Sequence, residues 1–430
     1  MDNIKLNYGE STVEFSIDGA REIKYLQGND IPRIDNIKEA FIKSVTSECV
    51  DSPPLKDLIE KEDKLTIIIS DLTRFWMRQD LICKELVDYL HEQLGVPYDN
   101  IVVLIALGTH RPAGEEELKK LASKEVFEKV QVLNHDALAE DLKYVGTTSR
   151  KTEVYVNSLV IGRKVIIISG TVHHVMAGFG GGRKSILPGV AGQLTIDQNH
   201  ILSLDPIEPK SNQLIGLGKL EGNPVNEDMI EAASFVSPLF CINVVANAES
   251  QPCKLISGHW LKSWEESTYK VNEYFGVPIE KKADVVIASC GGFPKDLNLY
   301  QSVKTLFNAS QALKDGGDLI LLAECREGGG APDFFDWIKS LKTNSLDADL
   351  RANFTIAGYI FYATCENINR GKAWLLSSIA KEKVEDMNLY AYTNINQLMK
   401  EMDLVNKDVY IMPYGGSTVP LIKKRKTDHL

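Results

Sequence analysis

Two α/β domains, built mainly on parallel sheets with the active site in the cleft between them, are the fold that this sequence predicts. Short apolar runs rich in β-branched residues recur along the chain, and each precedes a Gly or Asp turn and a helical pattern. A continuous apolar run indicates a strand covered on both faces, as in a parallel sheet. The chain of 430 residues is also long enough for two or three domains.

The expected strands fall into two series separated near residues 265–280. The first series is "LTIIIS" (65–70), "IVVLIALG" (101–108) and "VIIISG" (165–170). The second series is "ADVVIASCGG" (283–292), "GDLILLAEC" (317–325), "NFTIAGYI" (353–360) and "DVYIMPYGG" (408–416), with helix-like segments such as "SVKTLFNASQALKD" between them. We therefore expect a cofactor-binding domain over 1–268 and a second domain over 269–430, whose last residues are candidates to pack back on the first.

Composition excludes several classes of protein. A net charge of -11 argues against binding to nucleic acid, and the basic cluster "KKRK" (423–426) is expected to be a solvated tail. No apolar run is long enough to span a membrane, and the N-terminus does not resemble a signal peptide, so we expect a cytoplasmic protein. The seven cysteines are scattered and indicate neither a disulfide framework nor a zinc site.

Polar residues gather where the first three strands are expected to end. Asp71 and Arg74 follow the first strand, and Thr109 and His110 lie in the turn after the second, before a Glu-rich helix start. Ligands bind beyond the carboxyl ends of parallel strands. Asp71 could be a helix N-cap and His110 a structural histidine, but imidazole also suits proton transfer near neutral pH.

The third strand leads into "HHVMAGFGGGRKSILPG" (173–189), which is rich in glycine and cations. The P-loop pattern is broken, because Arg183 replaces its second glycine, so a nucleoside-triphosphate kinase is not favoured. Gly180, Gly181 and Gly182 would still let backbone amides approach an anionic group closely. Lys184 suits either a phosphate contact or a covalent bond to a cofactor.

His200 follows in "LTIDQNH", which is expected to be helical. No second histidine or thiolate lies at zinc spacing, so a metal site made by the protein alone is not expected. A cofactor that carries its own soft donor atoms would need only one histidine.

The motifs "DLTR", "GTHRP", "GTTSRKTEVYVN", "HHVMAGFGGGRKSILPG", "DQNH" and "FPKDLNLYQSVK" resemble, in this order, the nickel-pincer-nucleotide enzymes typified by lactate racemase. The resemblance implies a nickel pyridinium-3-thioamide-5-thiocarboxylate mononucleotide, made by maturation proteins and attached at Lys184. It implies His200 as the nickel ligand and His110 and His174 as the acid/base pair. His173 stands where the family more usually has proline.

The same resemblance implies racemisation or epimerisation of a 2-hydroxy acid by proton-coupled hydride transfer at C2. Asp71, Thr109, the three glycines and Arg183 would then surround the nucleotide. Arg74 would bind the substrate carboxylate, and Gln301, Lys304 and Lys295 would contribute from the second domain. Phe75 and Trp76 beside Arg74 could narrow the pocket for lactate, stack on a larger 2-hydroxy acid, or belong to the core.

Two other functions remain open from the sequence. A kinase or dehydrogenase using the glycine-rich loop would bind ATP or NAD without nickel. A carrier or sensor would bind the nickel nucleotide without turning substrate over, and would be indifferent to loss of His110 and His174.

Overall fold

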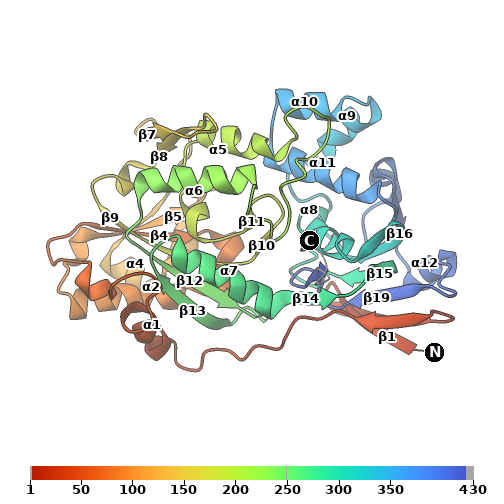
Figure 1. Cartoon of the computed structure of the whole chain (residues 1–430), viewed down its shortest axis with the longest axis horizontal. Helices are drawn as coiled ribbons and strands as arrows, with labels where there is room; N and C mark the ends of the chain where they lie inside the picture. The colour runs from red at the N-terminus through yellow and green to blue at the C-terminus, as the bar shows by residue number, and fades with distance from the viewer. Residues whose placement is uncertain (1, 248, 423–430) are drawn as a thin grey trace, which may run out of the picture. The chain divides into compact units, whose positions relative to one another are not determined.

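The computed structural model describes residues 2–247 and 249–422, and the chain forms two units, each built on its own six-stranded sheet (Figure 1). The first unit comprises residues 30–203 and 212–273. The second comprises the N-terminal residues up to 29, the segment 204–211 and the residues from 274 onward. Both sheets are largely parallel, so the predicted α/β class is confirmed.

The sheet of the first unit contains the three strands that the sequence predicts in this region. Its order is β13 (Pro252–Gly258), β12 (Phe240–Ala246), β9 (Lys164–Gly170), β4 (Leu65–Ser70), β5 (Ile101–Ala106) and β6 (Gln131–Asn134). Only the β12–β13 pair is antiparallel. The central strands are buried along nearly their whole length, which explains their continuous apolar sequences.

Helices pack against one face of this sheet to form its core. Alternate strand residues such as Ile67, Val103 and Ile166 belong to one apolar cluster with residues from these helices. The helices are α1 (Ile37–Thr46), α2 (Gln79–Asp88), α3 (Glu115–Ala122) and α4 (Lys124–Lys129).

The remaining elements of the first unit include two short hairpins and three helices. The hairpins are β7 (Lys143–Thr147) with β8 (Glu153–Val156), and β10 (His173–His174) with β11 (Gly178–Phe179). The helices are α5 (Gln193–His200), α6 (Pro224–Val236) and α7 (Lys262–Phe275). The β7–β8 hairpin lies beside α5 and α6 (Figure 1).

The second unit has an entirely parallel sheet. Its order is β18 (Leu389–Tyr392), β17 (Lys372–Leu376), β16 (Leu313–Leu322), β15 (Ala283–Ser289), β19 (Asp408–Met412) and β3 (Glu22–Tyr25). Its other strands are β1 (Asp2–Tyr8) with β2 (Ser11–Ile17), and β14 (Gly276–Ile279) with β20 (Val419–Ile422). Its helices are α8 (Leu299–Ser310), α9 (Ile338–Lys342), α10 (Leu346–Ala352), α11 (Ile356–Ile368) and α12 (Ile395–Glu401).

Two features differ from the sequence-based expectation. The first 29 residues join the second unit rather than the domain predicted over 1–268, because β3 pairs with β19 and the β1–β2 hairpin shares its apolar cluster. The run over 353–360, predicted to be a strand, begins helix α11 instead. Thr355 caps this helix by accepting from the Gly358 amide at 2.9 Å. A helix that is buried on most of its surface has a continuous apolar sequence, as a buried strand does.

Within the described residues, no helix is both long and apolar enough to cross a membrane. All seven cysteines are free thiols in this part of the chain, in agreement with their scattered spacing. The basic cluster over 423–426 lies outside the described residues. The last residues of the chain, which were candidates to pack back on the first domain, lie outside them too.

Candidate active site

Three neighbouring strands of the first unit end beside the residues that the sequence singled out. Strands β9, β4 and β5 are adjacent and parallel, so their carboxyl ends meet at one edge of the sheet. Asp71 follows β4 directly, His110 lies in the loop after β5, and His174 lies in the loop after β9. The structure therefore brings the predicted polar groups of this unit to one edge.

Asp71 and His110 form a hydrogen-bonded pair. The Asp71 side chain caps the short helix Leu72–Met77 by accepting from the Thr73 amide at 3.0 Å, and it also contacts His110 Nδ1. Burial opposes ionisation of Asp71, but the hydrogen bonds from His110 and Thr73 outweigh it and lower the pKa of the carboxyl group. Because an ionised carboxylate only accepts, His110 Nδ1 carries the hydrogen, and in the neutral ring Nε2 holds the lone pair. The ring is about half exposed, at 49%.

His174 and Lys184 form a second pair, in which the other ring nitrogen of the histidine carries the hydrogen. The amides of Met176 and Ala177 donate to His174 Nδ1 at 3.2 and 3.3 Å. In the neutral ring Nε2 therefore carries the hydrogen, and it lies 3.4 Å from Lys184 Nζ. Burial, together with the charges of Arg183 and Arg74, lowers the pKa of Lys184 well below its usual value. Both effects favour the neutral form of the amine, which is a nucleophile, beside the imidazole.

Arg183 does not present its guanidinium to a ligand. It is fully buried, and all of its N–H groups donate within the protein, to carbonyls of residues 177–181 and to Asn226 Oδ1. The guanidinium carbon also lies 3.8 Å from the centroid of the Trp264 ring. The predicted contact of Arg183 with the nucleotide is therefore not supported, and Arg183 instead braces the loop that carries His174 and Lys184.

The glycines before Arg183 are also explained by the fold itself. The Gly180 amide donates to Val172 O at 2.7 Å, and the Gly182 amide donates to Ser169 Oγ at 2.8 Å. Gly182 has a φ of +53°, and a Cβ there would lie 2.5 Å from the Trp264 ring. A Cβ on Gly181 would lie 2.9 Å from Gly170 O. Close packing therefore requires glycine at 181 and 182, and the predicted contact of the three glycines with a nucleotide stays a prediction.

His200 ends helix α5, as predicted for a helical "LTIDQNH" segment. Its side chain is buried, and its Nδ1 lies 2.9 Å from Ile196 O, so Nδ1 donates and Nε2 keeps its lone pair. Burial and the charge of Lys184 lower the pKa of His200 to about 3. Within the described ranges, no cluster of three or more histidines, cysteines or carboxylates could hold a metal. A metal at His200 would need donor atoms from a cofactor.

Arg74 and Thr109 flank these pairs. Arg74 is half-buried and donates to Thr73 Oγ1 at 3.1 Å, and its charge contributes to the low pKa of Lys184. Thr109 is exposed beside His110. Phe75 and Trp76 pack against the apolar cluster of the first unit, which favours the structural interpretation of these aromatic residues.

Lys295, Gln301 and Lys304 belong to the second unit. Gln301 and Lys304 lie one helical turn apart on α8, and Lys304 Nζ donates to Gln301 Oε1 at 2.5 Å. Lys295 lies in the loop after β15, with its side chain close to Gly291 and Gly416. Their role in substrate binding stays a prediction.

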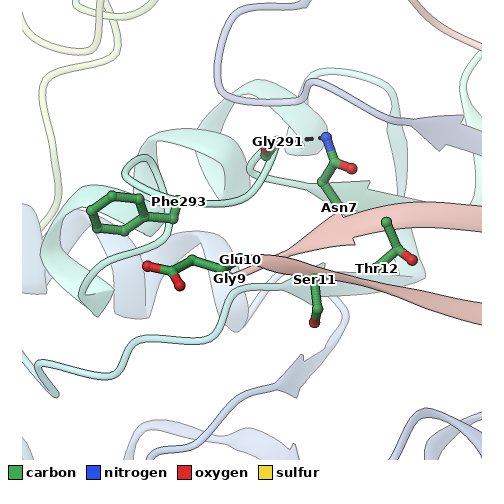
Figure 2. Close-up of a pocket in the computed structure, with 7 residues that line it drawn as sticks. All are labelled: Asn7, Gly9, Glu10, Ser11, Thr12, Gly291 and Phe293. Atoms are coloured by element: carbon green, nitrogen blue, oxygen red, sulfur yellow. Dashed lines mark hydrogen bonds between the residues drawn. The ribbon is translucent and has the colours of Figure 1, made fainter.

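The second unit also contains a surface pocket of about 660 Å³ between the turn of the β1–β2 hairpin and the loop after β15 (Figure 2). Asn7, Glu10, Gly291 and Phe293 are among its lining residues, and Asn7 Nδ2 donates to Gly291 O at 3.4 Å. None of the candidate site residues lines it. The candidate acid/base pair and the candidate cofactor lysine instead lie near the strand ends of the first unit.

Comparisons with known proteins identify the family of this chain. The model of the lactate racemase N-terminal domain matches residues 8–211, and that of the lactate racemase C-terminal domain matches residues 279–418. A lactate racemase from Thermoanaerobacterium thermosaccharolyticum is 32% identical over 345 residues, which cover 80% of this chain and 79% of the relative. A lactate racemase from Lactiplantibacillus plantarum is 28% identical over 336 residues, which cover 77% of each chain.

The similarity extends to three dimensions. The structure of the lactate racemase apoprotein from Thermoanaerobacterium thermosaccharolyticum matches with a TM-score of 0.84 and 28% identity, covering 98% of this chain and 100% of that one. Both halves of the chain thus match the same family, in sequence and in fold. This chain belongs to the lactate racemase family.

Proposed function

We propose that this racemase inverts C2 of a 2-hydroxy acid by proton-coupled hydride transfer, with a nickel-pincer nucleotide attached at Lys184. The observation that carries this proposal is the environment of Lys184. The residue is half-buried, the pKa of its amine is lowered, and the amine lies 3.4 Å from an imidazole. A lysine that bound phosphate as a point charge would instead need to stay protonated.

The side chains present fit the cofactor. Lys184 offers an amine with a lowered pKa for a covalent bond. His200 offers the Nε2 lone pair of an imidazole whose other nitrogen is held by Ile196 O, which is the usual arrangement of a metal-ligating histidine. His200 alone would complete the coordination of a nickel ion that brings its other donors with it.

The two histidines of the site are suited to opposite proton transfers. His110 presents a basic Nε2, because Asp71 holds the hydrogen on Nδ1. His174 presents an Nε2–H group, because backbone amides occupy its Nδ1. His110 would take the proton of the 2-hydroxyl group from one enantiomer, and His174 would return a proton to the product oxygen on the other side. The bound cofactor would accept and return the C2 hydride.

Binding of the substrate carboxylate is assigned to Arg74, which lies next to Thr73 and acts electrostatically on Lys184. A guanidinium can hold a carboxylate through two parallel hydrogen bonds. The relatives are named lactate racemases. Lactate is therefore the first substrate to test, followed by larger 2-hydroxy acids.

The proposal is tested by loading the protein with the mature nickel nucleotide and measuring nickel content, peptide masses and racemisation of several 2-hydroxy acids. Wild type is expected to carry a cofactor-sized adduct on the Lys184 peptide and about one nickel per chain. Lys184→Ala is expected to lose both. Absence of the adduct, or binding of ATP or NAD instead, would refute the proposal in favour of an ordinary nucleotide site.

A further inference from the structure

The motif "GTTSRKT" (146–152) has no role in the site described so far. Thr148 and Thr152 lie in the turn of the β7–β8 hairpin, and both are almost completely buried, at 4% and 1% exposure. The Thr152 amide donates to Thr148 Oγ1 at 3.1 Å, so the Thr148 hydroxyl hydrogen is directed elsewhere. Two buried hydroxyl groups in an exposed hairpin require partners.

Both hydroxyl groups donate to Asp228 on α6. Thr148 Oγ1 lies 2.5 Å from Asp228 Oδ1, and Thr152 Oγ1 lies 2.8 Å from Asp228 Oδ2. Asp228 is fully buried, and no described residue forms a salt bridge with it. A buried carboxylate without a cation is costly unless hydrogen bonds satisfy it. When all of its hydrogen bonds are made, such a group holds its neighbours rigidly in one arrangement.

The third donor connects Asp228 to the candidate nickel ligand. Asn199 Nδ2 donates to Asp228 Oδ2 at 2.9 Å and to Val225 O at 3.2 Å, and Asn199 immediately precedes His200 on α5. The preceding turn of α5 is held separately, because Thr195 Oγ1 donates to Glu153 O at 2.7 Å. The helix is thus fixed to β8 by Thr195 and to α6 by Asn199.

We propose that Asp228 is a positioning residue that fixes the rotation of α5, and so the direction of His200, through Asn199, with Thr148 and Thr152 holding the carboxylate in place. We call these four residues the Asp228 network. Successive residues on a helix differ in direction by about 100°, so holding Asn199 also holds His200. A 20° rotation of α5 would move a side-chain atom about 5 Å from the axis by about 2 Å. Metal–ligand distances tolerate only about 0.2 Å.

This inference rests on the proposed function for its purpose, but its structural part can be tested without cofactor. Amide hydrogen exchange is measured on peptides covering 193–203 in the cofactor-free protein, and on peptides from α2 as a reference. In parallel, the loaded protein is mixed with a chelator and the rate of nickel loss is measured. Loss of groups that orient a metal ligand typically weakens binding by about 10- to 100-fold.

Asn199→Ala removes the hydrogen bond between Asn199 and Asp228. Thr152→Val removes the hydrogen bond that Thr152 donates to Asp228, while keeping the shape of the side chain. Both are expected to speed exchange in 193–203, but not in α2, and to speed nickel loss about tenfold. Thr152→Ser restores the hydroxyl group and is expected to restore both properties. Ser44→Ala removes the acceptor of a buried hydrogen bond that Ser257 of β13 donates to α1, and as the matched control it is expected to change neither property.

Combining the two substitutions separates a connected network from independent effects. In the Asn199→Ala background, Thr152→Val is expected to cause no further change in α5, because the connection is already broken. The proposal is overturned if the single variants exchange like Ser44→Ala, if exchange rises equally in α2, or if their effects simply add. Wild type that takes up no nickel would refute the proposed function, and the exchange data would still decide whether the network holds α5.

Discussion

His173, the neighbour of His174, is expected to make the fold sensitive to acid. Its ring packs against Phe179 at an interplanar angle of 33° with the centroids 4.8 Å apart, and its Nε2 lies 2.8 Å from Asn272 Oδ1. Burial lowers the pKa of His173 from 6.5 to about 4. His173 therefore takes up a proton at a higher pH in the unfolded chain than in the folded chain. Its contribution to the free energy of unfolding is complete above pH 6.5 and is lost as the pH falls toward 4.

The size of this effect follows from the two pKa values. Between pH 7 and pH 5, one histidine with this shift reduces the free energy of unfolding by about 2 kcal/mol. His200, whose pKa is about 3, is expected to contribute a loss of similar size. His173→Gln keeps a donor for Asn272 but cannot titrate, so only the contribution of His173 is removed.

The assay is urea unfolding of wild type and His173→Gln at pH 7 and pH 5. On going from pH 7 to pH 5, the variant is expected to lose about 2 kcal/mol less free energy of unfolding than wild type. Carboxylates and the other histidines titrate in both proteins and cancel in the comparison. Equal losses in the two proteins would refute the assignment of a neutral His173 in the folded protein.

Three further predictions concern the loop and the acid/base pair. Arg183→Lys keeps the charge but offers at most three N–H donors, so the free energy of unfolding is expected to fall by about 3 kcal/mol. Unchanged urea denaturation would contradict the bracing role. His110→Ala and His174→Ala are each expected to slow racemisation by about 10²- to 10⁴-fold while nickel content stays at the wild-type level. Retained activity would point to a different acid/base pair. Asp71→Asn is expected to slow racemisation with little change in KM, because His110 loses the partner that fixes its tautomer. A change confined to KM would instead indicate a role in substrate binding.

The sequence was sufficient to predict that candidate polar residues follow the ends of neighbouring strands. Buried strands followed by polar turns indicated Asp71 and His110, and the family resemblance added His174 after the third strand, because parallel strands place their carboxyl ends together. The helical segment ending at His200 was also predicted correctly. These features depend on local patterns of a few residues, which a single sequence reveals.

Features that depend on distant partners were not predictable. Arg183 was expected to surround the nucleotide, but its acceptor Asn226 and its stacking partner Trp264 lie far along the chain, and no local pattern identifies them. The pairing of β3 with β19 similarly joins the two ends of the sequence. The apolar run at α11 was ambiguous for a different reason, because burial on all sides removes the periodicity that distinguishes helix from strand.

The most direct test of hydride transfer is the fate of the hydrogen at C2. The loaded protein is given one enantiomer of a 2-hydroxy acid deuterated at C2, in ordinary water, and the deuterium content of the opposite enantiomer is measured by mass spectrometry. Hydride transfer predicts that the product keeps its deuterium, because the hydrogen is never released to solvent. Loss of deuterium to solvent would show that C2 is deprotonated by a side chain, and would contradict the proposed mechanism.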